Sequence, residues 1–190
     1  MKKIIFLALF LIFLAALNYA ADFSLGLFYG LRTVNDADIR HTYGHGYIYY
    51  PYISLNIVKG IFIGAGYEGG YSKEGKIGKY QEQTSLTVTG AEFFIGYQLG
   101  LKIISPYLKI GLGYFAYQQN IESPYIEGYK VDHKKTTVTV SGGFKVFLLN
   151  NFYLGAEVKY TPLKVKPYDY EVDLGGVRYL VGLGLRFDFK

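Results

Sequence analysis

Apolar and polar residues alternate along most of the chain after residue 21. The alternation is clearest near the C-terminus, where every odd-numbered residue from 177 to 189 is apolar. The even-numbered residues of the same segment include Arg178, Arg186 and Asp188. Because successive side chains of a strand point to opposite faces, this pattern predicts a strand with one wholly apolar face. The segment is longer than the about 9–11 residues that a tilted strand needs to cross a bilayer.

The same period-two pattern recurs along the chain and predicts eight strands in total. They are 23–32, 46–58, 61–71, 84–98, 106–117, 135–147, 152–161 and 177–189. Short turns follow the second, fourth and sixth strands, whereas the connections 33–45, 72–83, 118–134 and 162–176 are longer and polar. An even number of antiparallel strands with this alternation of connections is typical of an outer-membrane barrel. We therefore predict an all-β protein that is an eight-stranded antiparallel up-and-down transmembrane β-barrel.

Residues 1–21 have the parts of a secretory signal peptide. Two lysines follow Met1, an apolar run occupies 4–17, and small residues at 20 and 21 provide a cleavage point. The apolar run is shorter than the about 20 residues of a spanning helix, so we expect cleavage rather than an uncleaved membrane anchor. Residues 22–190 then form a single barrel domain. No later apolar run approaches spanning length, so a β-barrel is the membrane structure open to this part.

The charged residues inside the predicted strands all lie on the less apolar face. An Arg or Lys facing lipid at mid-depth would cost about 2–4 kcal/mol, so we assign this face to the lumen. The interior of an eight-stranded barrel is just wide enough for side chains to fill, and buried charges need partners. We predict a lumen ion-pair network of Arg32, Glu68, Glu92, Lys109, Lys145, Glu157, Lys159, Arg178, Arg186 and Asp188. A narrow, weakly anion-preferring water path is an alternative to a lumen filled by ion pairs. A soluble lipocalin-like barrel with the faces reversed is an alternative to the membrane barrel.

Tyrosine is unusually common, with 21 Tyr and 14 Phe but no Trp. Tyrosines near strand ends on the outer surface form the aromatic girdle of a membrane barrel. We assign the girdle to Tyr47, Tyr49, Tyr67, Tyr71, Tyr114 and Tyr160. A carbohydrate-stacking surface is an alternative that fits loop residues Tyr125, Tyr129 and Tyr168 better.

The remaining chemistry-bearing patterns are weak. The chain has no Cys, which excludes a disulfide scaffold, a thiolate metal site and a Cys nucleophile. The formal net charge of +5 comes without a basic cluster suited to nucleic acid. The segment 64–69 matches the G-x-G-x-x-G pattern, but no helical periodicity follows it. His41 and His45 stand near Asp36 and Asp38 at irregular spacing in a loop, which disfavours a metal site. We therefore predict no catalytic residue, no metal and no cofactor.

The C-terminal segment Val181 to Phe189, Val-Gly-Leu-Gly-Leu-Arg-Phe-Asp-Phe, and the segment 153–160 carry a resemblance to a known family. They resemble the small eight-stranded outer-membrane barrels of Gram-negative bacteria, the OmpA/OmpX-type β-barrel domain family, over essentially the whole mature chain. The resemblance implies a place in the cell outer membrane, contact with its lipid, and recognition of the last strand by the barrel-assembly machinery. The residues of this assembly signal are Tyr179, Gly182, Leu185, Phe187 and Phe189.

The function predicted from these patterns is non-enzymatic. We expect a monomeric integral outer-membrane barrel with a side-chain-filled lumen and a structural or surface-interaction role, which presents its loops to an unidentified extracellular ligand. A narrow pore, or a conduit for small molecules like that of OmpW-type barrels, is the first alternative. A lipid-modifying outer-membrane enzyme is the second, although His133 and Ser141 are too far apart to supply a Ser–His pair on one strand.

Overall fold

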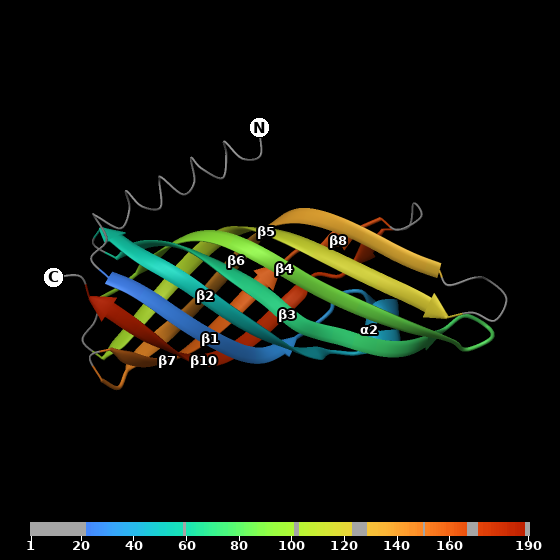
Figure 1. Cartoon of the computed structure of the whole chain (residues 1–190), viewed down its shortest axis with the longest axis horizontal. Coiled ribbons are helices and arrows are strands. Elements are labelled where there is room, and N and C mark those ends of the chain that lie inside the picture. Colours follow the sequence, from blue (N-terminus) through green and yellow to red (C-terminus); the bar gives the residue numbers. More distant parts are fainter. Residues whose placement is uncertain are drawn as a thin grey trace.

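Eight strands close into an antiparallel barrel with the order β1-β10-β7-β6-β5-β4-β3-β2 (Figure 1). The computed structural model describes residues 22–58, 60–100, 103–122, 129–149, 151–166 and 171–188. Each barrel strand pairs with its neighbour in the chain, and β1 pairs with β10 to complete the cylinder. The predicted up-and-down barrel is confirmed. The signal peptide predicted at 1–21 lies outside the described residues.

The barrel strands differ markedly in length. They are β1 (Asp22–Arg32), β2 (Gly46–Val58), β3 (Ile61–Ile77), β4 (Glu82–Gln98), β5 (Ile104–Glu122), β6 (Tyr129–Phe147), β7 (Phe152–Thr161) and β10 (Gly176–Asp188). The connections of one end also contain helix α2 (Ala37–Tyr43) and a small hairpin of β8 (Lys164–Val165) and β9 (Val172–Asp173). We call this end the long-loop end and the opposite one the short-turn end. No helix among the described residues is long and apolar enough to cross a membrane.

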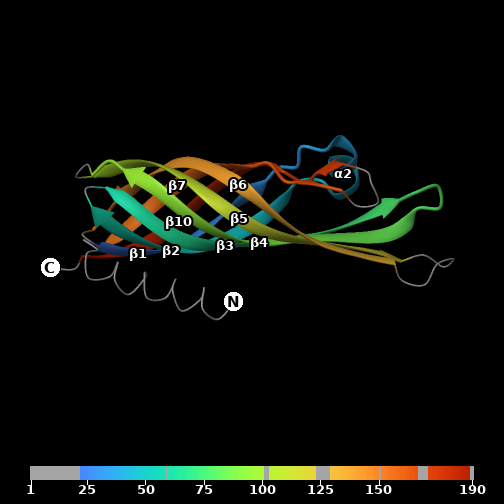
Figure 2. The ribbon, with the colours of Figure 1, turned by 90° about the horizontal axis from the view of Figure 1, so that it is seen from above.

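Strands β3 to β6 continue beyond the rest of the barrel at the long-loop end (Figure 2). The register runs from Ser72 on β3 to Thr87, Gln118 and Asp132 on the following strands, so the extension is a four-stranded antiparallel sheet. We call it the projecting sheet. The loops predicted at 72–83 and 118–134 are therefore largely strand, and that part of the prediction is wrong. The outer face of the extension is polar and its inner face mixes polar with apolar residues, so it lacks the regular apolar alternation that located the other strands.

The two faces of the barrel wall have opposite chemistry. On β1, Ser24, Phe28 and Arg32 are buried in the lumen, whereas Leu25 and Leu27 are exposed on the outer surface. Aliphatic and aromatic side chains cover the outer surface of the other barrel strands as well. This is the arrangement of a membrane barrel and the reverse of a lipocalin-like one.

A bulge in β3 changes which face its residues occupy. The register with β4 shifts between Glu68 and Tyr71, and Gly70 has a φ of 93°, a conformation that favours glycine. The shift places Glu68 and Tyr71 both inside, although the period-two pattern puts them on opposite faces. Tyr71 is only 1% exposed, so its assignment to the girdle is wrong.

Candidate functional site

Five buried charges form one cluster in the lumen toward the long-loop end. Oε1 of Glu68 on β3 lies 3.2 Å from Nη1 of Arg32 on β1 and 3.2 Å from Nη2 of Arg178 on β10. Nζ of Lys159 on β7 lies 3.5 Å from Glu68 Oε2 and 2.9 Å from Glu92 Oε2 on β4. All five side chains are at most 3% exposed. The ion pairs thus connect opposite walls and neutralise charge in a buried interior.

The strand register explains why Glu68 must reach across the lumen. Arg32 stands directly opposite Arg178, and Arg178 directly opposite Lys159, so three cations lie side by side on adjacent strands. Like charges in such positions destabilise a sheet. Besides Glu68, each guanidinium binds a backbone carbonyl: Arg32 Nη2 donates to Leu174 O at 2.7 Å and Arg178 Nη1 to Gly176 O at 2.7 Å. The cluster therefore also fixes the segment that covers this end of the lumen.

A second ion pair lies deeper in the barrel among aromatic rings. Lys109 Nζ is 2.9 Å from Glu157 Oε2, and the hydroxyl of Tyr107 donates to the same oxygen at 2.7 Å. Lys109 Nζ also lies 4.4 Å from the ring centroid of Phe94. The Tyr50 hydroxyl donates to Glu92 at 2.9 Å and so links this level to the cluster above. Buried cations here are stabilised by both carboxylates and ring faces.

Aromatic rings surround the ammonium group of Lys145. Its Nζ lies 5.0–5.8 Å from four ring centroids, those of Tyr52, Phe62, Tyr107 and Tyr153. The residue is 5% exposed, and among the described residues no carboxylate oxygen lies within 4 Å of it. Lys145 was predicted to belong to the lumen ion-pair network. That prediction is wrong, because aromatic rings surround its ammonium group where a carboxylate was expected.

The last two predicted network members lie at the short-turn rim. Arg186 Nε is 3.2 Å from Asp188 Oδ1, and their side chains are 28% and 48% exposed. These two residues pair with each other, and the guanidinium of Arg186 also lies 4.3 Å from the ring centroid of Phe147. The predicted network therefore divides into a charged cluster near the long-loop end, a central ion pair, an aromatic cage and a partly exposed rim pair.

Aromatic side chains pack tightly against the backbone between these groups. The hydroxyls of Tyr52 and Tyr153 are 2.7 Å apart, and Tyr52 and Phe28 meet edge to face at 5.4 Å. A Cβ added to Gly26 would lie 2.3 Å from Cε1 of Tyr52. Side chains thus fill the lumen at this level, as expected for eight strands.

A small apolar core covers the long-loop end. We call the segments 33–45, 162–166 and 171–175 the cap. The cap contributes buried Val34, Tyr43, Leu163, Val165 and Leu174, which pack with inward-facing Leu86, Val88, Tyr117 and Val131 of β4, β5 and β6. Burial of so many apolar groups makes the cap a folded unit rather than a set of solvated loops.

Hydrogen bonds join the parts of the cap to one another and to the projecting sheet. The backbone N–H of Asn35 donates to Gly175 O at 3.0 Å. The hydroxyl of Tyr43 lies 2.8 Å from Thr84 Oγ1 and accepts from Gln119 Nε2 at 2.7 Å. On the exposed side, Lys164 donates to Glu171 at 2.8 Å, and this hydrogen bond lowers the pKa of the Glu171 carboxyl.

Of the polar residues that were considered for a metal site, Asp36 has a structural role and the two histidines are exposed. Oδ1 of Asp36 accepts from the N–H groups of Asp38 and Ile39 at 3.0 and 3.1 Å, and so caps α2. His41 and His45 are exposed, and within the described residues no group of three His, Asp or Glu side chains is placed to hold a metal ion. The glycine-rich segment 64–69 lies in strand β3 of the barrel wall.

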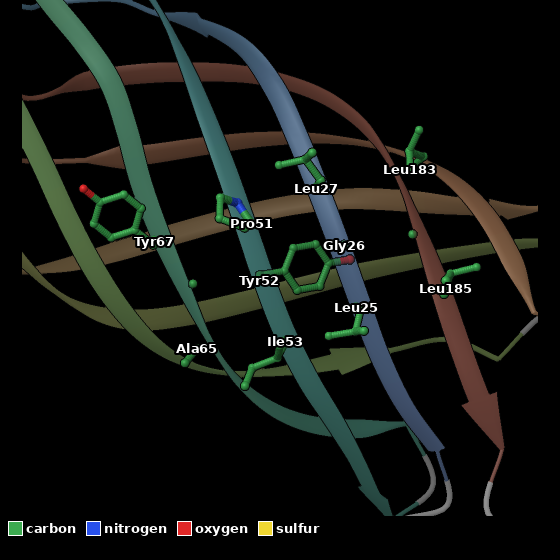
Figure 3. A pocket seen from close by; sticks show the side chains of 12 residues that line it. Leu25, Gly26, Leu27, Pro51, Tyr52, Ile53, Ala65, Tyr67, Leu183 and Leu185 are labelled. Atoms are coloured by element: carbon green, nitrogen blue, oxygen red, sulfur yellow. The ribbon is translucent and has the colours of Figure 1, made fainter.

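An apolar groove of about 560 Å³ lies on the outer surface over β10, β1, β2 and β3 (Figure 3). Short Pro51 and Ala65 lie between longer neighbours such as Leu27 and Tyr67. Because the groove is open and carries almost no polar surface, it suits the acyl chains of surrounding lipid and offers no group for chemistry.

Three further predictions concern the aromatic girdle, the assembly signal of the last strand and the carbohydrate-stacking surface. Tyr47, Tyr49, Tyr67, Tyr114 and Tyr160 are exposed on the outer surface. In the last strand, Tyr179, Leu185 and Phe187 are exposed, Gly182 faces the lumen beside Phe28, and Phe189 lies outside the described residues. The carbohydrate-stacking alternative involves Tyr125 and Tyr168, which also lie outside the described residues.

The sequence reasoning missed the cap, although isolated apolar residues in the predicted loops were its signal.

Comparisons with known proteins agree with this architecture. The family model of the outer membrane protein beta-barrel domain matches residues 4–187. OprG of Pseudomonas aeruginosa is similar with a TM-score of 0.68 and 11% identity, over 90% of this chain and 98% of OprG. Ail, the attachment invasion locus protein of Yersinia pestis, is similar with a TM-score of 0.59 and 14% identity, over 87% of this chain and 98% of Ail.

A search of curated protein sequences gave no match. The family model and the matched structures agree with the closed eight-stranded barrel of this chain. The chain belongs to the outer membrane protein β-barrel domain family and resides in the outer membrane.

Proposed function

We propose that this protein is a non-enzymatic outer-membrane barrel whose lumen is closed by its own side chains and whose extracellular end is a preformed interaction surface. The observation that carries the proposal is the cross-lumen cluster around Glu68. It links β3 to β1, β10 and β7, and the carbonyl of Leu174 in the cap receives a hydrogen bond from the same Arg32. Ions or solutes would have to break these contacts to pass.

The long-loop end supports the second half of the proposal. In this family the long connections face outward, so the cap and the projecting sheet stand outside the cell. Tyr43 ties helix α2 to the sheet, and the apolar core beneath holds the segments in one arrangement. A rigid surface loses little conformational entropy when it binds a partner. Ail, named an attachment invasion locus protein, and Neisserial surface protein A are neighbours with names that fit a surface role.

The positions of the histidines favour a non-enzymatic role. His41, His45 and His133 are all exposed, and the ring of His133 stacks on Tyr117 at 5.6 Å. The buried carboxylates Glu68, Glu92 and Glu157 are each bound by lysine or arginine, which suits a structural role better than proton transfer.

A monomeric state and recognition of the last strand by the barrel-assembly machinery stay predictions.

Conductance across a planar bilayer tests the closed lumen. We expect no steady conductance from refolded residues 22–190. A folded variant with both Tyr52→Ala and Phe94→Ala, whose lumen has lost two rings, is the matched reference for an enlarged interior. A reproducible open channel in the unaltered protein would overturn the proposal in favour of the narrow-pore alternative. Lys109, Lys145 and Lys159 would then be the first residues to test for ion selectivity.

A further inference from the structure

The seam between β1 and β10 begins with two facing carboxylates. Asp22 pairs with Asp188 at the short-turn end, where the first and last barrel strands lie side by side (Figure 1). The N–H of Arg186 donates to Asn151 O on the β7 side at 2.7 Å. Antiparallel bonding alternates along a strand, and the register of the seam has no bulge, so Asp188 also directs its backbone away from β1. Asp22 and Asp188 are therefore a non-hydrogen-bonded pair, the kind in which facing side chains come closest.

The two carboxylates differ in their partners. Arg186 Nε lies 3.2 Å from Asp188 Oδ1, whereas the Asp22 carboxylate accepts a hydrogen bond from the Asn56 side chain at 3.1 Å. Among the described residues, no lysine or arginine nitrogen lies within 4 Å of the Asp22 carboxylate. Asp22 is half-buried, and like charges that face each other across paired strands destabilise the pairing. In the described part of the chain, the seam therefore begins with a carboxylate that lacks a cation.

The cleavage predicted from the sequence would create a cation at this point. The small residues at positions 20 and 21 predict hydrolysis of the peptide bond between residues 21 and 22. This reaction consumes one water. The carbonyl carbon leaves with the signal peptide as a carboxylate, and the nitrogen stays on Asp22 as an α-amino group that is protonated at neutral pH. Before cleavage the same nitrogen is an uncharged peptide amide, so processing adds one positive charge beside the facing carboxylates.

We infer that the α-ammonium group released at Asp22 pairs with the carboxylate of Asp188 across the seam and so secures the closed barrel. The ammonium lies near the carboxylate of its own residue in the unfolded chain as well, so the gain on folding comes from Asp188, which only the closed seam brings close. The uncleaved precursor has a neutral amide there and should close less firmly. Removal of the signal peptide is then a step in folding as well as in export, and this goes beyond the proposed surface role.

The test is a cycle of two changes, measured by urea unfolding in phospholipid vesicles. The native terminus is residues 22–190 freed from a tag by a protease that leaves no extra residue. The extended terminus carries Gly-Gly before Asp22, which moves the ammonium about 7 Å away. Each terminus is made with Asp188 and with Asp188→Asn. With Asp188, we expect the extension to raise the unfolding equilibrium constant about threefold, as for a partly exposed ion pair; with Asp188→Asn, it should change that constant by less than about 1.5-fold.

The pH dependence identifies the titrating group. The α-ammonium faces the carboxylates of Asp22 and Asp188, the guanidinium of Arg186, the neutral amide of Asn56 on β2 and, farther inside on β6, the ammonium of Lys145. An unperturbed α-amino group has a pKa of about 7.7–8.0, and a carboxylate partner at the rim raises this pKa in the folded barrel. The advantage of the native terminus is therefore complete at about pH 6 and is lost as the pH rises through the folded value. We expect no advantage at about pH 10, because the other titratable groups are common to both termini and cancel.

Each of four results would overturn the inference. Equal unfolding constants for the two termini, or an extension effect that persists in Asp188→Asn, refute the pairing with Asp188. An advantage that remains at about pH 10 refutes the α-ammonium as its source. The mature protein is also recovered from outer membranes for mass spectrometry, and a first residue other than Asp22 places the ammonium elsewhere. The pH comparison of the two termini needs no substitution, so it decides the matter even if Asp188→Asn does not fold.

Discussion

Replacing Glu68 by Gln tests the central claim about the lumen, because it removes a charge while keeping the shape. The variant loses the charge in contacts of 3.2 Å to Arg32, 3.2 Å to Arg178 and 3.5 Å to Lys159. Arg32 and Arg178 keep their carbonyl acceptors, and Lys159 keeps Glu92. Removing one partner of a buried ion pair costs about 3–5 kcal/mol. Because the amide oxygen still accepts, we expect the lower end, about 3 kcal/mol.

The assay is urea unfolding of refolded residues 22–190 in phospholipid vesicles. The folded fraction is read from the mobility of unboiled samples on a gel and from tyrosine fluorescence, since the chain has no Trp. The midpoint should fall by the ratio of the free-energy loss to the m-value, with m unchanged. Glu74→Gln, at an exposed position of the projecting sheet, is the matched control and should change stability by less than about 0.5 kcal/mol.

A double variant distinguishes charge neutralisation from packing. If Glu68 mainly neutralises Arg178, then Glu68→Gln combined with Arg178→Gln should be less destabilising than the sum of the single changes. We expect a coupling of at least about 1.5 kcal/mol between these contacting residues. A loss below about 1 kcal/mol for Glu68→Gln, or additive single changes, would refute the reasoning.

Two further changes test the two faces of the barrel wall by the same unfolding assay. Gly26→Ala should cost about 1–3 kcal/mol, because its Cβ would lie 2.3 Å from Tyr52, whereas Gly100→Ala, with nothing within 4 Å, should be neutral; equal midpoints would contradict a filled lumen. Leu27→Arg should cost about 2–4 kcal/mol because the side chain faces lipid in mid-strand. Leu99→Arg at the short-turn rim should cost less than about 1 kcal/mol, and equal losses at the two positions would contradict the assignment of the lipid face.

The strands that cross the membrane could be predicted because lipid imposes a strict alternation. The bounds of β2 and β7 agree with the prediction at both ends, and Glu157 and Lys159 share the lumen face as expected. Where lipid ends, the constraint ends with it. Beyond the membrane the strands continue with polar residues such as Ser72 and Lys130 on the outer face and a mixed inner face, so a search for apolar alternation stops too early.

The details of the lumen depend on information that a single strand does not contain. The cage around Lys145 combines rings from β2, β3, β5 and β7, and only the register between strands brings them together. Tyr71 was predicted to lie on the outer surface but lies in the lumen, because the bulge in β3 shifts the alternation of its side chains by one residue. The cap was not predicted, because Val34, Leu163 and Leu174 are spaced irregularly along the chain. They form an apolar core only in the folded barrel, where their distant segments come together.

The pairing of the first barrel strand with the last has a kinetic consequence. Asp22 stands opposite Asp188, so the seam between β1 and β10 can form only when almost the whole chain is in place. Until then both strands have open edges, and Arg32 and Arg178 sit on opposite sides of a gap. The same carboxylate of Glu68 binds both guanidinium groups only after closure. Partly closed barrels therefore lack the contacts that join these guanidinium groups through one carboxylate, which makes closure cooperative and slow, as expected for contacts of such long range. Reopening has to recreate that costly state, so the finished barrel should persist long after its formation.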